Sequence, residues 1–486
     1  MKDVLREYSM VVDSFVRHHA RFLGVVMVTK MWWTWPLLVL LALQLPTRAL
    51  AQDEVSSELL QLIVNLMNDP DKDMRAIGFE QVRSEAKGEA ATKQFAAQLK
   101  ELSPEAAVGL LSALADRGDQ AAREEIIALL DASDNASIRV AGIRSLGALG
   151  GADDAARIVE IITSGPEAEQ QAAKVSLVNL QGSGVAQAIV QQMKQSPAET
   201  QVELMKVLTT RRALDTIPAL VATAKGKDPK TRAAAMAALG QLASEEHVAD
   251  MVQGVLKASK GAERAAAEKN VMFVCQRIGD LDQRAVALLA AMDDLNESDR
   301  AILLTTLGRV GGPQALEVVE AALNDRKQHS AGLRALCNWP DASVAPQLIE
   351  VVKTDKHRGH ATTALRALIR IAPLPDGRSD QQKLDLLKQA MELCQRDDER
   401  ILVLKRASAI RLPETLRFVL PYLDQPKFKE QACESIVDLA HHRNLREPNE
   451  DEFHAALDQV IAVSKDAVVV DRANRYKRDE TWVRPK

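Results

Sequence analysis

The sequence predicts an all-α fold, an α-solenoid of about 11–12 stacked helix pairs. Three observations lead to this expectation. A segment pattern recurs along the chain, and the apolar residues within each segment are spaced by three and four, as on one face of a helix. Aromatic residues make up only 3% of the 486 residues, fewer than a β-sandwich or an enzyme with a lined pocket needs. Period-two alternation of the length that a strand needs is missing.

The recurring segment occurs at residues 134–150, 228–242 and 299–311, and in all three an Arg precedes a Leu by seven residues. The spacing of successive segments is irregular, about 32 residues. The predicted units end near Gly150, Gly182, Arg212, Ala243, Gly279, Gly311, Trp339 and Ala372.

Each unit is expected to contain two amphipathic helices, as at residues 126–130 and 138–149. The second helix is expected to begin at an aspartate that accepts the first free backbone amides, and to end at a glycine in the left-handed conformation. The predicted N-caps are Asp134, Asp228 and Asp299, and the predicted C-terminal stops are Gly150, Gly279 and Gly311.

The second helices of these units share an acid-to-Arg opening and a Leu-Gly-x-Leu/Val closure. The opening occurs at Asp73/Arg75, Asp134/Arg139, Asp228/Arg232, Glu263/Arg264, Asp299/Arg300 and Glu399/Arg400. By these two features the chain resembles the HEAT-repeat family in its short bacterial form, which is related to the phycobiliprotein-lyase HEAT-like repeats. A first-helix Pro-x-Leu also recurs, at 218, 346 and 421, and is similar to the family's outer helix.

The likeness covers roughly residues 56–475 and implies a HEAT-like superhelix whose second helices line a concave side. It also implies a kink in the first helix at the proline. The opening Arg is expected to tie adjacent repeats through the preceding acid. Repeats 160–211 and 312–340 lack this Arg, and residues 373–380 and 443–451 are expected to form loops. The family scaffold serves many functions.

The N-terminus is predicted to be a secretory signal peptide. An apolar stretch begins at Trp35 and is followed by the small-x-small triplet 49–51, so cleavage is expected before Gln52. A retained membrane span is disfavoured because Gln44 and Arg48 interrupt the apolar run. The expected organisation is a leader at 1–51 (signal peptide 27–51, with 1–26 a mis-assigned start), a repeat array at 52–475 and a charged tail at 476–486. The expected location is periplasmic or extracellular, in a bacterium.

The charge disfavours nucleic acid as a partner. The net charge is −5, and removal of residues 1–51, with six bases and three acids, changes it to −8. No stable membrane insertion of the mature chain is expected, and the protein is expected to be a monomer. The four cysteines, each inside an apolar helical stretch, are expected to be buried free thiols rather than disulfides, because a full repeat or more separates them. They are Cys275, Cys337, Cys394 and Cys433.

No catalytic motif is found, and the sequence predicts no enzyme activity, cofactor or metal site. His357 and His360 have ligand-like spacing, but no Cys or close acidic residue completes a set, and Gly359 suggests a turn. The His-Glu motifs of the HEAT-type deoxyhypusine hydroxylases are missing. Acidic pairs at 153–154, 293–294 and 397–398 are expected to cap helices rather than to catalyse.

One pattern predicts a binding surface. The position five residues after the opening Arg is basic in six of eleven units, and it is expected to point away from the core, on the concave side. Such a stripe would bind an acidic peptide or an anionic glycan. The predicted stripe consists of Arg144, Lys206, Lys269, Arg334, Arg366 and Lys405.

The function predicted from these features is an exported, non-enzymatic scaffold that binds a partner protein on its concave surface. A lyase or chaperone-like protein on the phycobilin-lyase scaffold is the alternative, and it requires a hydrophobic groove with tyrosines or acids. A HEAT-like DNA glycosylase is a further alternative, and it requires a basic concave face with a central Trp, for which Trp339 is the one candidate.

Overall fold

The computed structural model describes residues 56–85 and 87–482, all within the compact unit that spans Asp53–Lys486. The predicted leader lies outside the described residues. These residues form α-helices and short 3-10 turns, and they contain no strand. The all-α solenoid predicted from the sequence is therefore confirmed. Thirteen successive helix pairs follow one another along this described part of the chain, one more than the upper end of the predicted range.

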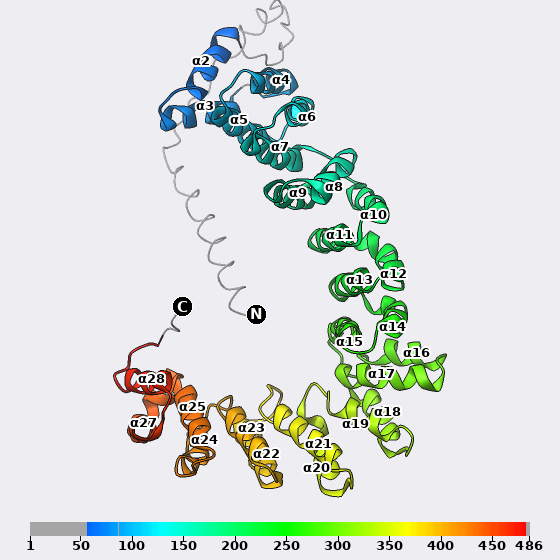
Figure 1. Cartoon of the computed structure of the whole chain (residues 1–486), viewed down its shortest axis with the longest axis vertical. Helices are drawn as coiled ribbons and strands as arrows, with labels where there is room; N and C mark the ends of the chain where they lie inside the picture. Colours follow the sequence, from blue (N-terminus) through cyan, green and yellow to red (C-terminus); the bar gives the residue numbers. More distant parts are fainter. Residues whose placement is uncertain (1–55, 86, 483–486) are drawn as a thin grey trace, which may run out of the picture. The chain divides into compact units, whose positions relative to one another are not determined.

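The second helices of the pairs form one row, in which each packs against the second helices before and after it. Figure 1 shows this row most clearly from α9 to α15. Its members are α3 (Lys72–Ser84), α5 (Pro104–Arg117), α7 (Ala136–Leu149), α9 (Glu167–Asn179), α11 (Ala198–Thr210), α13 (Pro229–Leu242), α15 (Ala262–Gln276), α17 (Glu297–Val310), α19 (His329–Leu336), α21 (Arg358–Ile371), α23 (Asp397–Ala407), α25 (Lys429–Ala440) and α28 (Ala467–Lys477).

The first helices form the other row, each packed on the second helix of its own pair. Its members are α2 (Ser57–Met67), α4 (Glu89–Ala97), α6 (Arg123–Ala132), α8 (Ala155–Ser164), α10 (Val185–Gln195), α12 (Ile217–Ala224), α14 (Val248–Lys257), α16 (Val286–Asp293), α18 (Pro313–Asn324), α20 (Ala345–Thr354), α22 (Asp380–Leu393), α24 (Pro413–Val419) and α27 (Glu450–Val463).

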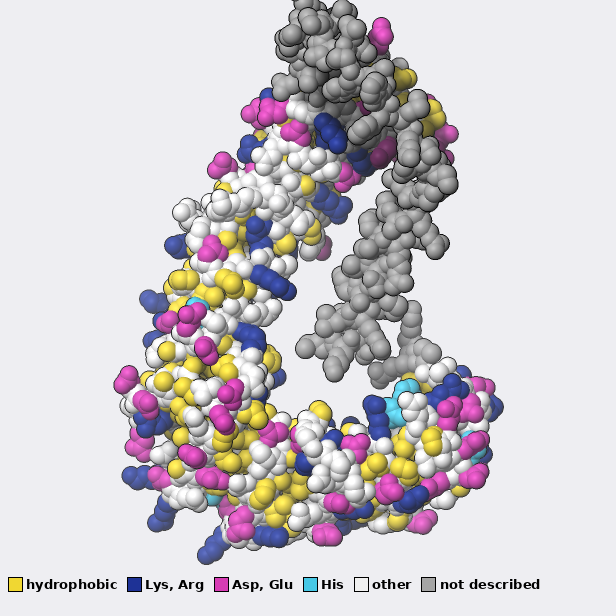
Figure 2. All heavy atoms as spheres, turned by 180° about the vertical axis from the view of Figure 1, so that it is seen from behind, with side chains coloured by type: hydrophobic (Ala, Val, Ile, Leu, Met, Phe, Trp, Pro, Cys, Tyr) yellow, Lys and Arg dark blue, Asp and Glu magenta, His cyan; other side chains and the backbone are white. Residues whose placement is uncertain are grey.

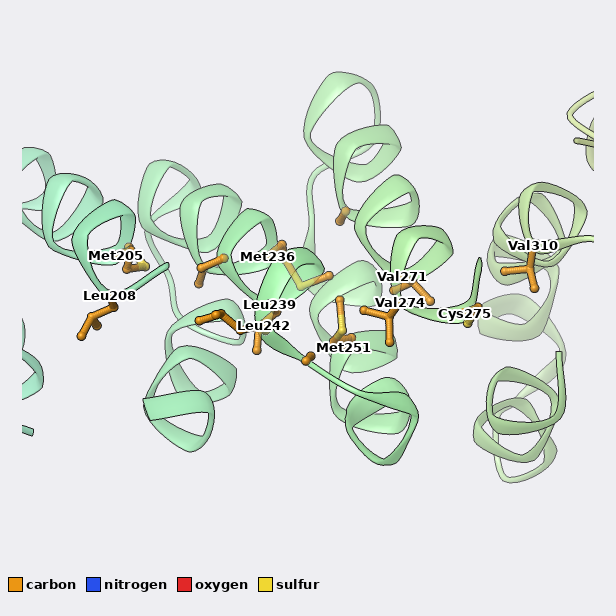
Figure 3. Close-up of a cluster of buried hydrophobic side chains, with 14 of the residues drawn as sticks. Met205, Leu208, Met236, Leu239, Leu242, Met251, Val271, Val274, Cys275 and Val310 are labelled. Carbon is orange, nitrogen blue, oxygen red and sulfur yellow. The ribbon is translucent and has the colours of Figure 1, made fainter. Parts of the chain in front are cut away.

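The core is a continuous apolar layer between the two rows. Its side chains are mostly Leu, Val, Ile, Met and Ala, because closely packed helices leave little room for rings. Figure 3 shows one section, where Leu208 of α11, Leu239 of α13, Met251 of α14 and Val271 of α15 follow one another along the layer. Each pair thus buries its apolar face only against its neighbours, as repeat proteins do.

The helix ends differ from several expectations. Asp228 is the N-cap of α13, accepting from the Thr231 amide at 2.8 Å, as predicted. The N-caps of α7 and α17 are Asn135 and Asn296, so Asp134 and Asp299 were wrong. Asparagine competes well with aspartate at this position because its side-chain oxygen accepts the same amides.

Only one predicted glycine stop has a positive φ: Gly311, with φ of 73° and ψ of −168°. This is not the left-handed helical conformation, so the predicted left-handed stop was wrong at Gly311 too. Gly150 ends α7 in an extended conformation (φ −83°), and Gly279 lies beyond the end of α15 without a positive φ. Glycine is still needed at 150, because an added Cβ would lie 2.6 Å from the Asp154 carboxylate.

The prolines of the Pro-x-Leu pattern lie in first turns rather than at kinks. Pro218 and Pro346 occupy the first turn of α12 and α20, each after a 3-10 turn, where the missing N–H has no cost. Pro421 lies in the 3-10 turn η7 (Leu420–Tyr422).

The loop predicted at 373–380 is confirmed up to Ser379, since α22 begins at Asp380. Residues 443–451 instead form α26 (Arg443–Arg446), the 3-10 turn η8 (Glu447–Asn449) and the start of α27. The predicted boundary at 475 falls inside α28, where Tyr476 is buried and its hydroxyl lies 3.0 Å from His441 Nδ1. The charged segment therefore caps the core rather than fraying.

Within the described ranges, no helix is both long enough and apolar enough to cross a bilayer.

Candidate functional site

The six residues of the predicted stripe lie on six different second helices, and all six are exposed. They occupy equivalent positions because each follows its helix opening by a similar number of residues. The structure places Arg144 on α7, Lys206 on α11, Lys269 on α15, Arg334 on α19, Arg366 on α21 and Lys405 on α23.

Two of the six cations are already paired. Lys206 Nζ lies 2.8 Å from Glu203, which also pairs with Lys174, and Arg366 lies 3.1 Å from Asp398. The other four, Arg144, Lys269, Arg334 and Lys405, make no ion pair with any described residue. These four therefore keep their charge available for an external anion.

The equivalent positions on other second helices are not basic. Val175 of α9 is 56% exposed and Ala237 of α13 is exposed, so the stripe is interrupted there by apolar surface. Phe273, one turn after Lys269 on α15, is 48% exposed. Ser435 of α25 is buried and donates to the Leu404 carbonyl at 2.9 Å, so the outward register ends before that helix.

A groove of about 750 Å³ lies between α11 and α13 on this surface. Its walls are largely apolar, with Val202 and Met205 from α11 and Ala234 and Ala237 from α13. The stripe residue Lys206 lines it. At its rim, Lys230 of α13 bonds to Glu199 of α11 at 2.9 Å, and both side chains are exposed.

A second groove, of about 650 Å³, lies between α23 and α25 and includes the stripe residue Lys405. Its wall is more polar, with Arg406, His441 and His442 beside Glu434. Burial and the nearby Arg411 lower the pKa of His442, so this ring is held neutral near pH 7. In Figure 2, Lys and Arg side chains alternate with Asp and Glu over the described surface in view. The basic stripe is thus a local row and not a broad positive patch.

Three of the six opening arginines tie adjacent repeats, as expected, but the accepting acid belongs to the following repeat. The other three, Arg264, Arg300 and Arg400, bond instead to carbonyls at the end of the first helix of their own repeat. Arg139 makes two bonds to Glu169, at 2.8 and 2.9 Å, and Arg232 makes two bonds to Glu263, at 2.9 and 3.1 Å. Arg75 reaches Glu105 in the same way. The same guanidinium also donates to carbonyls at the end of its own first helix or in the turn after it, as Arg139 does to the Leu130 carbonyl. Its role is structural, as expected.

A second row of arginines was missed by the sequence analysis. Arg211, the C-cap of α11, donates to the carbonyls of Leu177 and Leu180 in the preceding repeat, both at 3.0 Å. Arg277 and Arg370 do the same for α13 and α19. These carbonyls are among those that a helix end leaves without partners, and a cation there also opposes the helix dipole. Arg117 makes equivalent bonds to Val82 and Glu85.

Two of the three acidic pairs have structural partners, whereas Asp293 and Asp294 lie at the C-terminal end of α16 and do not cap a helix start as predicted. Asp154 is buried and accepts from Arg123 at 2.7 and 2.9 Å and from the Gly151 amide, and Asp397 pairs with Lys427 at 2.7 Å. Trp339 is 1% exposed and donates to Ser343 Oγ, so it is a core residue and is not presented on a surface for base contact. The four cysteines are free, as expected, with Cys337 half-buried and the others buried.

The prediction that no Cys or close acidic residue completes a metal-ligand set with His360 was wrong. Asp355 Oδ2 lies 2.9 Å from His360 Nδ1 and 2.9 Å from His329 Nε2, so three potential metal ligands meet here. Gly359 lies in the first turn of α21 and not in a loop. The sequence signal was present in part, because Asp355 precedes His357 by two residues. His329 is 26 residues before Asp355, and only the repeat packing brings it close.

No protein-family model matches the chain, and no curated protein sequence matches it. Solved helical proteins are similar to it at low identity. The karyopherin Kap121p bound to the extreme C-terminus of the protein phosphatase Cdc14p has a TM-score of 0.43 and 13% identity, over 84% of this chain and 54% of that chain. A homology model of the full-length AP-3 complex has a TM-score of 0.38 and 10% identity, over 86% and 92%. The chain spans about half the length of the karyopherin.

Proposed function

We propose that this protein is a non-enzymatic scaffold that binds an acidic segment of a partner protein along the exposed surface of its second-helix row. One observation carries the proposal: four cations on four second helices, Arg144, Lys269, Arg334 and Lys405, are exposed and make no ion pair with any described residue. A cation without an internal ion pair binds an external anion with a smaller cost in free energy, because no internal pair has to be broken first.

The surface between these cations suits a protein chain better than a small molecule. The groove between α11 and α13 has apolar walls, and Val175 and Phe273 add exposed apolar side chains on the flanking helices. A peptide with acidic and apolar side chains can use both features, whereas a purely anionic glycan leaves the apolar ones uncovered. The glycan remains an outcome of the test below.

The chain's arginines support a scaffold rather than an enzyme. The inter-repeat arginines bond to carboxylates and carbonyls of adjacent repeats, as Arg232 does to Glu263, and so stabilise the stack.

We also propose that residues 1–51 direct export and are removed. The first residue of the protein isolated from its native source tests this, and Gln52 is the expected result.

The proposed function is tested by capture experiments with three forms of the protein. The stripe variant carries Glu at Arg144, Lys269, Arg334 and Lys405. The control variant carries Glu at Lys194, Lys257, Lys353 and Lys388, which lie on first helices and make no ion pair with any described residue. Both variants change the net charge equally.

We expect wild type and control to capture the same protein from an envelope extract, and the stripe variant to lose it at unchanged helical content by circular dichroism. Because the contacts are charged, raising the salt from 50 to 500 mM should weaken capture in wild type. Equal capture by all three forms, or capture of a glycan alone, would exclude the proposal.

A further inference from the structure

The strongest unexplained cluster of side chains joins two adjacent repeats at their polar edge. His329 is the first residue of α19, Asp355 is the C-cap of α20, and His360 lies in the first turn of α21. One oxygen, Asp355 Oδ2, lies 2.9 Å from His329 Nε2 and 2.9 Å from His360 Nδ1. The three donor atoms all lie within 4.8 Å of one another.

Backbone contacts hold two of the three ligand groups in place. His329 Nδ1 lies 2.6 Å from the Leu323 carbonyl, which can only accept, so Nδ1 carries the hydrogen. When His329 is neutral, its ring therefore has the lone pair on Nε2, and this atom faces the cluster. Asp355 Oδ1 accepts the His357 amide at 2.7 Å, which leaves Oδ2 to the two rings. Metal-binding histidines are commonly oriented by such a hydrogen bond from the other ring nitrogen.

Both rings of the cluster share one acceptor atom, Asp355 Oδ2. With no cation present, both rings must place an N–H on the same carboxylate oxygen, and His329 then carries protons on both nitrogens. A metal ion would replace the two shared hydrogens and bind the same three atoms.

We propose that His329, Asp355 and His360 bind one divalent transition-metal ion of the Zn²⁺ type. Two imidazoles and one carboxylate favour Zn²⁺ and its neighbours over Mg²⁺ or Ca²⁺, which prefer oxygen ligands. A tetrahedral ion with bonds of about 2 Å needs donor atoms about 3.3 Å apart, so small side-chain rotations suffice.

The site is open enough to admit the ion and a fourth ligand. The side chains of His329, Asp355 and His360 are 33%, 12% and 24% exposed, so water reaches them. The His357 ring lies 4.4 Å from the His360 ring between centroids, and it is exposed. The fourth position is therefore filled by water or by His357. An ion here joins the repeat α18–α19 to the repeat α20–α21 and stiffens that junction of the array.

The test uses the full chain without an affinity tag, freed of metal by a chelator, and titrated with ZnCl₂ by calorimetry. The variants are H329Q, D355N and H360Q, and the matched control is H247Q, which changes a histidine bonded only to Ser244 and Glu246. Replacing Zn²⁺ by Co²⁺ adds an absorption spectrum that reports the ligand geometry.

We expect one tight Zn²⁺ ion in wild type and in H247Q, and affinity lower by on the order of tenfold or more in each of the three variants. Zn²⁺ should raise the melting temperature of wild type and not that of the variants. Equal binding by all five proteins would place the metal elsewhere, and no binding by wild type would make the cluster a hydrogen-bonded junction only. Either result overturns the proposal. Far-ultraviolet circular dichroism of each variant confirms that it is folded.

Discussion

At the scale of single residues, two carboxyl groups of the same helix, α15, have pKa values shifted in opposite directions. Burial raises the pKa of Glu268, and nearby Arg309, at 3.4 Å, and Arg264 do not reverse this direction. Burial also acts on Glu263, but hydrogen bonds from Ser259 and Arg232 hold its pKa below the usual value. These two residues are therefore expected to change the pH dependence of stability in opposite directions.

The first prediction concerns the pH dependence of stability in E268Q and E263Q. Because the folded-state pKa of Glu268 is raised, its stabilising contribution is complete below about pH 4, the unfolded value, and is lost as the pH rises through the folded value. The contribution of Glu263 has the opposite sign, being complete above about pH 4 and lost as the pH falls through the folded value. Urea-unfolding midpoints at pH 3 and pH 7 measure both, because the lower pH lies below the unfolded value.

Going from pH 3 to pH 7, wild type should lose stability relative to E268Q and gain stability relative to E263Q. Shifts of the same sign in the two variants would contradict the assignment. Neither substitution alters α17, the helix of Arg309. The buried Thr306 Oγ1 of this helix, which has no hydrogen-bond partner in the structure, is therefore the same in both variants.

The sequence predicted residues with local roles better than residues with distant partners. Asp228 was found as an N-cap because its acceptor role depends on the next three residues. The second arginine row was missed because Arg211 and Arg277 bond to backbone carbonyls. Every residue has such a carbonyl, so the sequence does not show which one accepts the bond. A recurrence of Arg at the ends of second helices was the available signal. His329 could not be linked to Asp355 without the packing of the two repeats.

At the scale of helices, glycines set how closely second helices approach. An added Cβ at Gly147 of α7 would lie 2.5 Å from the Ser176 Cα of α9, a backbone atom that cannot move alone. Ser176 itself donates to the Ile143 carbonyl at 2.8 Å across the same interface. The small residues and the hydroxyl bond together fix the spacing of α7 and α9.

The second prediction is that Gly147→Ala destabilises the protein by about 1–3 kcal/mol, because the extra methyl forces α7 and α9 apart. Thermal or urea unfolding measures the change. Gly279→Ala is the matched control, since nothing lies within 4 Å of the added Cβ and the residue has no positive φ. The control should be unchanged or slightly more stable. A loss of stability in the control as large as that in the test variant would contradict the packing argument.

At the scale of the whole described array, each helix pair depends on its neighbours alone. The core runs without interruption between the rows, and the main contacts between helices join the same pair or adjacent pairs. The approximate period and the helix order were predictable because they depend on local apolar spacing, whereas the repeat count was one pair too low. The exposed cations were predictable as a set, since each follows from its place in a repeat, whereas their free or paired state depends on the neighbouring helix.

The third prediction tests this locality with Arg232→Met. Removal of the guanidinium leaves Glu263 without its two bonds across the α13–α15 junction, a loss of about 3 kcal/mol for a buried pair. Hydrogen exchange followed by mass spectrometry should show lost protection in helices α11 to α17 and unchanged protection in α5 and α25. Uniform loss along the chain would show that the array unfolds as a single unit.

The second arginine row also bears on how the chain folds as it leaves the ribosome. Arg211, Arg277 and Arg370 each reach back to the helix end of the repeat made before them. A newly made second helix therefore keeps bare carbonyls at its end until about 30 further residues have emerged and supplied the guanidinium. Each repeat completes its predecessor, so that the growing tip of the nascent chain is always the least finished part of the structure.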